Sequence, residues 1–94
     1  MVDGKKFSIQ IAESKTFFKS KKSLDAKLYQ KINWLVYPEL VKNPFLGTNI
    51  KKLKGNWSDC YRYRIGNYHL FYFIDLEQAV VVIIALSHRQ SSYK

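Results

Sequence analysis

Apolar and polar residues follow two different periods along the chain. Over Phe7–Ala12 they alternate one for one, which is typical of a β-strand. Glu13 and Ser14 then open a helical region, and in its second part apolar residues recur every three or four positions, which is the period of an α-helix; they are Leu24, Leu28, Ile32, Leu35 and Val36. The first helical stretch carries Phe17 and Phe18, and a second helix is expected to be capped by Ser23.

A proline marks the end of this helical region. The residue before a proline avoids the α region, so Tyr37–Pro38 is expected to kink or end the second helix. One more turn can run through Val41 before Asn43–Pro44 closes it. Residues 45–55 then form a predicted connection that ends in the basic run KKLKG.

Three further strands are predicted in the second half of the chain. Cys60–Ile65 and Tyr68–Asp75 are joined by Gly66–Asn67, a pair that suits a tight hairpin turn. Ala79–Ser87 is an almost continuous apolar run, as expected of a central strand buried on both faces. The predicted order is β-α-α-β-β-β, an α+β fold with two N-terminal helices packed on a mostly antiparallel four-stranded sheet. A chain of this length forms one domain, residues 1–94.

The two-residue turn also predicts which side chains share a face of the sheet. It pairs Arg64 with His69 and Arg62 with Phe71, and side chains alternate between faces along each strand. One face therefore carries Arg62, Arg64, His69, Phe71 and Phe73. The other face carries the residues expected to form the core under the helices, which are Tyr61, Tyr63, Ile65, Leu70, Tyr72 and Ile74.

The formal net charge of +9 and the pI of about 9.7 are extreme for 94 residues. Such a charge disfavours the compact state unless an anion compensates it, and nucleic acid, an anionic membrane surface and an acidic protein are the candidates. The longest apolar run is too short to span a bilayer, and the N-terminus lacks the apolar stretch of a signal peptide. A single cysteine without metal-ligand spacing fits a reducing cytoplasm, and no metal or cofactor is expected.

Arginine is distributed differently from lysine. Nine of the thirteen lysines lie in the first fifty residues, whereas the arginines and histidines all lie after position 60. These residues are Arg62, Arg64, His69, His88 and Arg89. Two guanidinium groups on one strand can both contact a single phosphate. The alternative is that Arg62 and Arg64 are only the solvated side of a strand, but the clustering favours an anion-binding site.

The C-terminal segment SHRQSSY continues this basic character. His88 and Arg89 follow the last predicted strand, and Tyr93 comes four residues later. On spacing alone, His88 is equally well explained as a strand-end residue without a role. Tyr93 is equally well explained as an aromatic residue that covers the sheet edge.

Three segments, LKG, DCYRYRIGNYHLFYFID and VVVIIALSHRQSSY, together resemble the RelE-like toxins of the RelE/ParE superfamily, from type II toxin–antitoxin modules. The resemblance covers nearly the whole chain in element order. It implies a ribosome-dependent mRNA endonuclease that a cognate antitoxin inhibits. In such toxins the two alternating basic residues, here Arg62 and Arg64, face the mRNA backbone, and His69 stands where arginine is usual. The remaining site positions of the family fall on His88, Arg89 and Tyr93.

The resemblance also implies a reaction, in which the ribose 2′-OH attacks the adjacent phosphate without a metal. Guanidinium groups stabilise developing negative charge, so the scissile phosphate is assigned to Arg62, Arg64 and Arg89. Histidine suits proton transfer, and His88 is preferred over His69 for this role. Tyr93 is assigned to stacking on a base or orienting it. Less specific contacts with the RNA backbone are assigned to Lys51, Lys52 and Lys54.

Two other functions remain open from the sequence. One is a ParE-like gyrase inhibitor without catalysis, although such relatives generally lack the clustered basic residues seen here. The other is a basic RNA- or DNA-binding module, in which Phe71 and Phe73 would stack on bases. The expected partners are mRNA on the ribosome and an acidic antitoxin, which would cover the basic face or pack on the helices.

Overall fold

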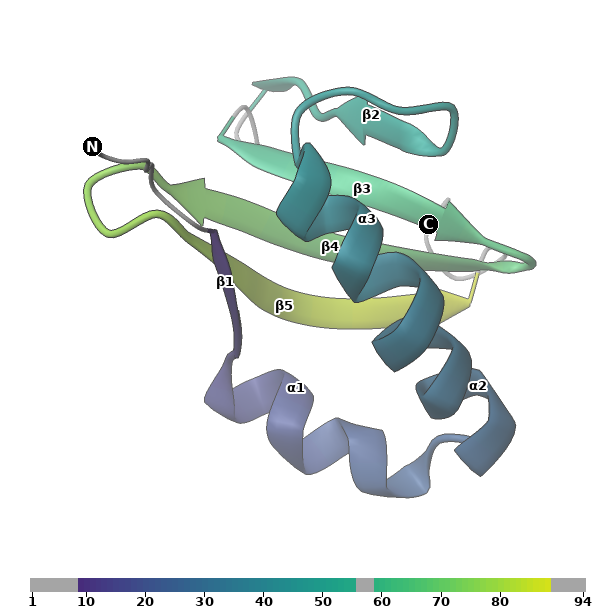
Figure 1. Ribbon diagram of the computed structural model, residues 1–94. Helices are drawn as coiled ribbons and strands as arrows, with labels where there is room; N and C mark the ends of the chain where they lie inside the picture. Colours follow the sequence, from purple (N-terminus) through teal and green to yellow (C-terminus); the bar gives the residue numbers. More distant parts are fainter. Residues whose placement is uncertain (1–8, 56–58, 89–94) are drawn as a thin grey trace.

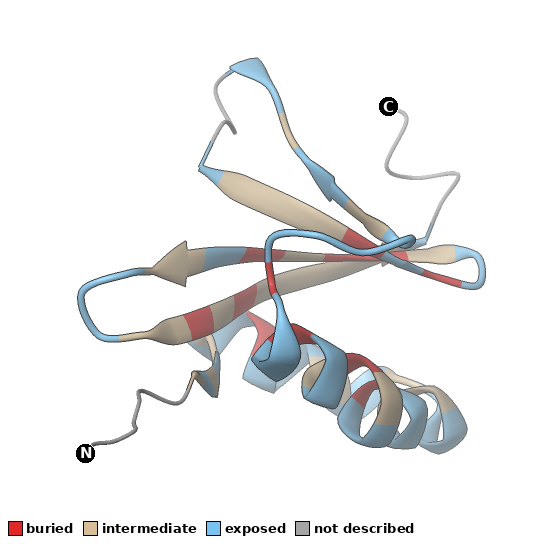
Figure 2. Cartoon of the chain, turned by 45° about the horizontal axis from the view of Figure 1, so that its top comes forward, coloured by how far each residue is buried: buried red, intermediate tan, exposed pale blue. Residues whose placement is uncertain are grey.

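The computed structural model describes residues 9–55 and 59–88, which form an α+β fold with all helices on one face of a mixed sheet (Figures 1 and 2). The sheet has the strand order β1-β5-β4-β3-β2. Its strands are β1 (Gln10–Glu13), β2 (Ile50–Lys52), β3 (Cys60–Ile65), β4 (Tyr68–Asp75) and β5 (Val80–His88). The helices are α1 (Lys15–Ser20), α2 (Ala26–Lys31) and α3 (Tyr37–Lys42). No helix in this part of the chain is long and apolar enough to cross a membrane.

The predicted fold class is confirmed, but the sheet has five strands where four were expected. Residues 45–55 were expected to be only a connection, yet Ile50–Lys52 pairs antiparallel with β3. The strand is three residues long, too short for an alternating pattern to reveal it. At the opposite edge, β1 pairs in parallel with β5, whereas all other pairs are antiparallel. The first half of the predicted strand Phe7–Ala12 includes residues outside the described part.

Ser14 joins the first helix to the sheet. Its Oγ accepts a hydrogen bond of 3.1 Å from the N–H of Phe17, so it caps α1. The same Oγ donates to the carbonyl oxygen of Ile84 on β5, at 3.2 Å. The prediction that Ser23 caps the second helix is wrong. Leu24 has an extended backbone, so α2 begins only after Asp25, whose carboxylate accepts from the N–H of Lys27 at 3.1 Å.

Pro38 does not end the helical region. A π-helical segment, Ile32–Val36, connects α2 directly to α3, so the helix continues (Figure 1). Tyr37 is helical, with φ −60° and ψ −44°, so the expectation that it avoids the α region is wrong. A proline ring clashes with a carbonyl in the preceding turn of a regular α-helix, and the wider π-helical turn relieves that clash. Asn43 ends α3 as expected.

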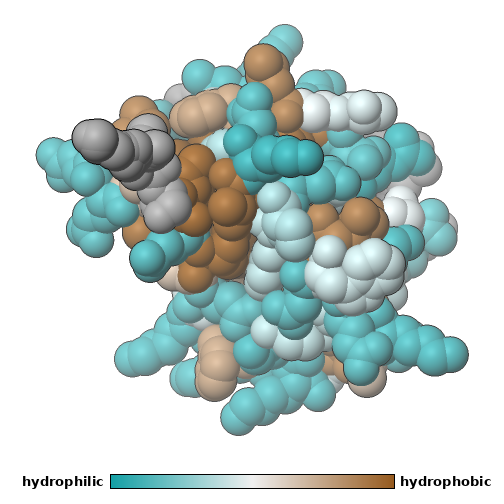
Figure 3. Space-filling model, in the orientation of Figure 1, coloured by the Kyte–Doolittle hydropathy of each residue, from teal (hydrophilic) through white to brown (hydrophobic). Residues whose placement is uncertain are grey.

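The β3–β4 hairpin has the predicted register. Arg64 lies opposite His69 and Arg62 opposite Phe71. Gly66 in the turn has φ +59°, a conformation that glycine adopts without strain. The predicted core face packs under the helices, with Tyr63, Ile65, Leu70 and Tyr72 buried and Tyr61 and Ile74 partly buried. The helix layer itself is covered mostly by hydrophilic side chains, with a hydrophobic area beside α3 (Figure 3).

A β-bulge interrupts the pairing of β4 with β5. Tyr72 lies opposite Ile83, but the preceding residue Phe71 lies opposite Ala85, so Ile84 is an extra residue in β5. The bulge reverses the alternation of side chains along the rest of β5. The carbonyl of Ile84 is the group that accepts from Ser14, so α1 is attached to the sheet at the bulge.

Candidate nucleic-acid interface

The face of the sheet opposite the helices carries the basic residues of the hairpin. On β3, Arg64 is exposed and Arg62 is half-buried. On β4, His69 lies opposite Arg64 and is only 6% exposed. Phe71 is partly buried beside it. The hairpin therefore brings Arg62, Arg64 and His69 together, as predicted.

The unexpected strand β2 adds lysines to this face. Lys51 lies opposite Arg62, so the two side chains share a face. A groove of about 380 Å³ runs between β2 and the hairpin. Its lining residues are Lys51, Lys52, Leu53, Lys54, Arg62, His69 and Phe71. All three lysines assigned to RNA are thus in the groove, whereas Arg64 lies on the same face outside its lining.

The groove combines positive charge with an apolar wall. Four of its seven lining residues are cations, and no carboxylate from the described residues lines it. Leu53 and Phe71 supply apolar surface within the same groove. Such a site suits an anion that also has a flat or apolar part. The cations attract the charged part of the ligand, and the apolar side chains pack against its flat part. Leu53 was not singled out from the sequence, although it is the only apolar residue within KKLKG.

His69 contacts Arg62 and Phe71 in the groove. Its Nε2 lies 3.4 Å from Nη1 of Arg62, a long hydrogen bond. Its ring meets the ring of Phe71 edge-on, with centroids 6.2 Å apart and planes at 90°. The imidazole is therefore held between an arginine and an aromatic ring.

The structure does not bring His88 to this groove. Counted from Val82, which shares the basic face, strict alternation would place His88 on that face as well. The bulge at Ile84 reverses the alternation, and His88 pairs with Tyr68, whose side chain belongs to the helix-covered side. The two rings meet edge-on at 5.2 Å between centroids. The predicted site residues Arg89 and Tyr93 lie outside the described residues.

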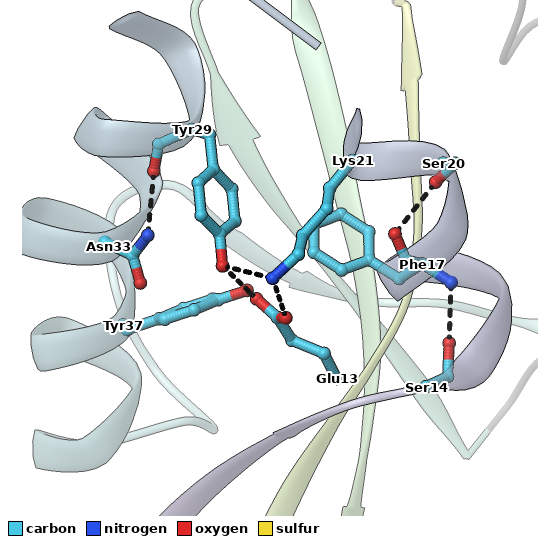
Figure 4. Close-up of polar contacts among 8 residues, drawn as sticks. All are labelled: Glu13, Ser14, Phe17, Ser20, Lys21, Tyr29, Asn33 and Tyr37. Atoms are coloured by element: carbon cyan, nitrogen blue, oxygen red, sulfur yellow. Dashed lines mark hydrogen bonds and ion pairs between the residues drawn. The ribbon is translucent and has the colours of Figure 1, made fainter. Parts of the chain in front are cut away.

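A second polar cluster, not predicted from the sequence, lies between β1 and the helices (Figure 4). Glu13 accepts from Lys21 at 2.8 Å through Oε1, and from Tyr29 at 2.7 Å and Tyr37 at 2.8 Å through Oε2. Lys21 also donates to the Tyr29 hydroxyl at 2.9 Å. Burial alone would raise the pKa of Glu13, but these hydrogen bonds outweigh it and lower the pKa below its ordinary value.

Metal and thiol chemistry find little support in this part of the chain. No group of three or more histidine, cysteine or acidic residues within 9–55 and 59–88 is placed to hold a metal ion. Burial raises the pKa of the Cys60 thiol, and the adjacent Asp59 carboxylate raises it further. Cys60 is therefore poorly suited to act as a nucleophile at neutral pH.

The fold and the basic face define a small basic α+β domain, and comparison with known proteins gives its family. The family model described as the ParE toxin of the type II toxin–antitoxin system parDE matches residues 10–93. The chain therefore belongs to this family, within the RelE/ParE superfamily, and is a toxin of a type II toxin–antitoxin module. No curated protein matches the sequence.

Solved structures of RelE toxins have the same fold. The RelBE2 toxin–antitoxin complex from Mycobacterium tuberculosis contains a chain with 23% identity and a TM-score of 0.76, over 88% of this chain and 100% of that chain. A RelB–RelE complex from Methanococcus jannaschii gives 27% identity and a TM-score of 0.66, over 87% and 94%. The isolated RelE toxin of E. coli gives 22% identity and a TM-score of 0.70, over 85% and 83%.

Proposed function

We propose that this toxin is a ribosome-dependent mRNA endonuclease, and that the β2–β3–β4 groove binds the RNA strand at the cleavage site. The observation that carries the proposal is the groove itself, in which Lys51, Lys54 and Arg62 gather around a buried imidazole with no described carboxylate to neutralise them. RNA supplies both the negative charge and the flat bases that such a groove accommodates.

The groove would supply charge stabilisation to the reaction. When the 2′-OH attacks the adjacent phosphate, negative charge develops on the phosphorane oxygens, and Arg62 and Arg64 stand on the rigid hairpin to meet it. Arg89 is proposed as the third phosphate ligand and Tyr93 as the residue that stacks on a base. His88 remains the proposed proton carrier; because its exposed side chain lies outside the groove, beside Tyr68 at the end of β5, this role requires the reacting 2′-OH to lie at that end of the sheet.

The test is cleavage of mRNA on programmed ribosomes by the Arg62→Ala variant. Loss of one preorganised charge stabiliser should reduce the cleavage rate roughly a hundredfold. Lys27→Ala is the matched control, because Lys27 is an exposed cation on α2, on the opposite side of the sheet. Full activity of an Arg62→Ala, Arg64→Ala double variant would rule out this groove as the catalytic site.

The proton carrier and the third arginine need their own variants. His88→Gln removes the proposed proton transfer, which is worth roughly a hundredfold to ten-thousandfold in rate. Arg89→Ala should cost about as much as Arg62→Ala, because both are proposed to stabilise the same phosphorane. Wild-type rates for both variants would contradict these assignments.

A second candidate function is gyrase inhibition, because the matching family model describes ParE toxins. In that case, expression of the toxin would induce DNA breaks and leave mRNA intact. In cells that express the toxin, Arg62→Ala would then leave mRNA integrity unchanged, because the wild-type toxin would not cleave mRNA either. Sequencing of mRNA 5′ ends and measurement of DNA breaks in the same culture separate the two functions.

The proposed partner is an acidic antitoxin, and the proposed location is the cytoplasm, where ribosomes translate mRNA. Support comes from the family description and from solved relatives that are toxin–antitoxin complexes. The net charge of +9 favours an acidic partner. Co-expression of the protein encoded beside the toxin should relieve growth arrest, and failure of that rescue would argue against this partner.

A further inference from the structure

His69 is the polar residue most deeply enclosed on the basic face. It lies in the middle of the sheet, opposite Arg64 on β3 and Ser87 on β5, with 6% of its surface exposed. The ring of Phe71 packs edge-on against it. These neighbours leave the imidazole little freedom to rotate or to follow a reacting atom.

The contact with Arg62 indicates which form of the ring is present. A guanidinium group has only donors, so the 3.4 Å contact is a hydrogen bond only if Nε2 of His69 accepts. Nε2 must then carry no proton, and the neutral ring holds its proton on Nδ1. Protonation of Nε2 would place a second cation against Arg62, in a groove that Lys51, Lys52 and Lys54 also line.

We infer that His69 is a positioning residue that holds the Arg62 guanidinium in the groove, rather than a carrier of protons. This inference rests on the proposed RNA cleavage. The lone pair that would accept the 2′-OH proton is directed at Arg62, and the other ring nitrogen already carries a proton. Arginine has a long, flexible side chain, so an acceptor in a buried wall reduces the number of orientations open to it.

Two variants of His69 separate positioning from proton transfer. His69→Gln keeps a carbonyl oxygen that can accept from Arg62 but cannot carry protons, whereas His69→Leu removes the acceptor. The inference predicts that the cleavage rate of the Gln variant stays within about threefold of wild type, while the Leu variant loses about tenfold. Equal losses of a hundredfold or more in both variants would identify His69 as a proton carrier and overturn the inference.

A measurement without RNA decides whether the contact exists. Nitrogen NMR of the histidine rings in the folded wild-type protein should show the His69 proton on Nδ1, and Arg62→Ala should shift the Nε2 signal. A proton on Nε2, or a signal that ignores Arg62→Ala, overturns the inference even if the variants lose activity. If the wild type cuts no mRNA, the proposed function fails, and this spectrum still reports on the contact independently.

Discussion

The two polar clusters of this protein differ in whether their charges are balanced by opposite charges within the cluster. Between β1 and the helices, Glu13 is matched by Lys21, Tyr29 and Tyr37, and each of its oxygens accepts at least one hydrogen bond (Figure 4). On the opposite face of the sheet, four cations line the groove without a described carboxylate. The first cluster satisfies its own charges, while the second needs an anion from outside.

This difference indicates that the Glu13 cluster stabilises the fold, whereas the groove serves to bind a ligand. In the helix-side cluster, the hydrogen bonds with Glu13 and Tyr29 raise the pKa of Lys21, and the same set lowers the pKa of Glu13. Both shifts favour the charged forms, so the cluster stabilises the native state. The groove offers no such compensation, and its cations repel one another until a ligand binds. Substitutions should therefore affect stability in one cluster and binding in the other.

The largest effect is expected from Glu13→Leu. The substitution leaves the Tyr29 and Tyr37 hydroxyls without their carboxylate acceptor in a half-buried site, so the free energy of unfolding should fall by about 2–3 kcal/mol. Chemical denaturation measures this. Glu77→Leu, at an exposed position in the β4–β5 turn, is the control and should change it by less than about 0.5 kcal/mol. Similar losses in both variants would remove the distinction between the clusters.

The groove lysines should show the opposite behaviour. A Lys51→Ala, Lys54→Ala double variant should keep its stability but bind single-stranded RNA about tenfold more weakly at low salt. Each phosphate contact contributes about 0.7 to the slope of log K against log salt, so the slope should shrink by about 1.4. Titrations at several salt concentrations measure it. A double variant of Lys15 and Lys19 on α1, away from the groove, should leave the slope unchanged.

The Glu13 cluster should also make stability depend on pH. A carboxylate with a lowered pKa contributes stability above its unfolded pKa, near 4.5, and loses it as pH falls through the folded pKa. Wild type should therefore exceed Glu13→Gln in stability at pH 7, and the difference should narrow as the pH falls below 4.5. Denaturation at a series of pH values checks this. A constant difference down to pH 3 would show that the charge of Glu13 contributes nothing.

The hairpin could be predicted from sequence because its determinants are local. The Gly66–Asn67 turn fixes the register, and the register fixes the faces of Arg62 and His69. The Glu13 cluster could not be found in this way, because its partners are 8 to 24 positions away and meet only through helix packing. The face of the sheet on which His88 lies could not be predicted from the sequence either, because it depends on the bulge formed by a single extra residue, Ile84.

The smallest effect, and the sharpest test of what the groove binds, concerns Phe71. Phe71 and Leu53 are the apolar lining residues, so a base can lie against the ring while the lysines hold the phosphates. Phe71→Leu keeps apolar volume but removes the ring, and it should weaken binding of a short oligoribonucleotide about threefold. Binding of polyphosphate with the same number of charges should not change, because it has no bases. Phe73→Leu, on the same strand face but outside the groove lining, should leave both affinities unaltered. Equal weakening of both ligands by Phe71→Leu would mean that the groove recognises charge alone, and that its aromatic wall serves packing.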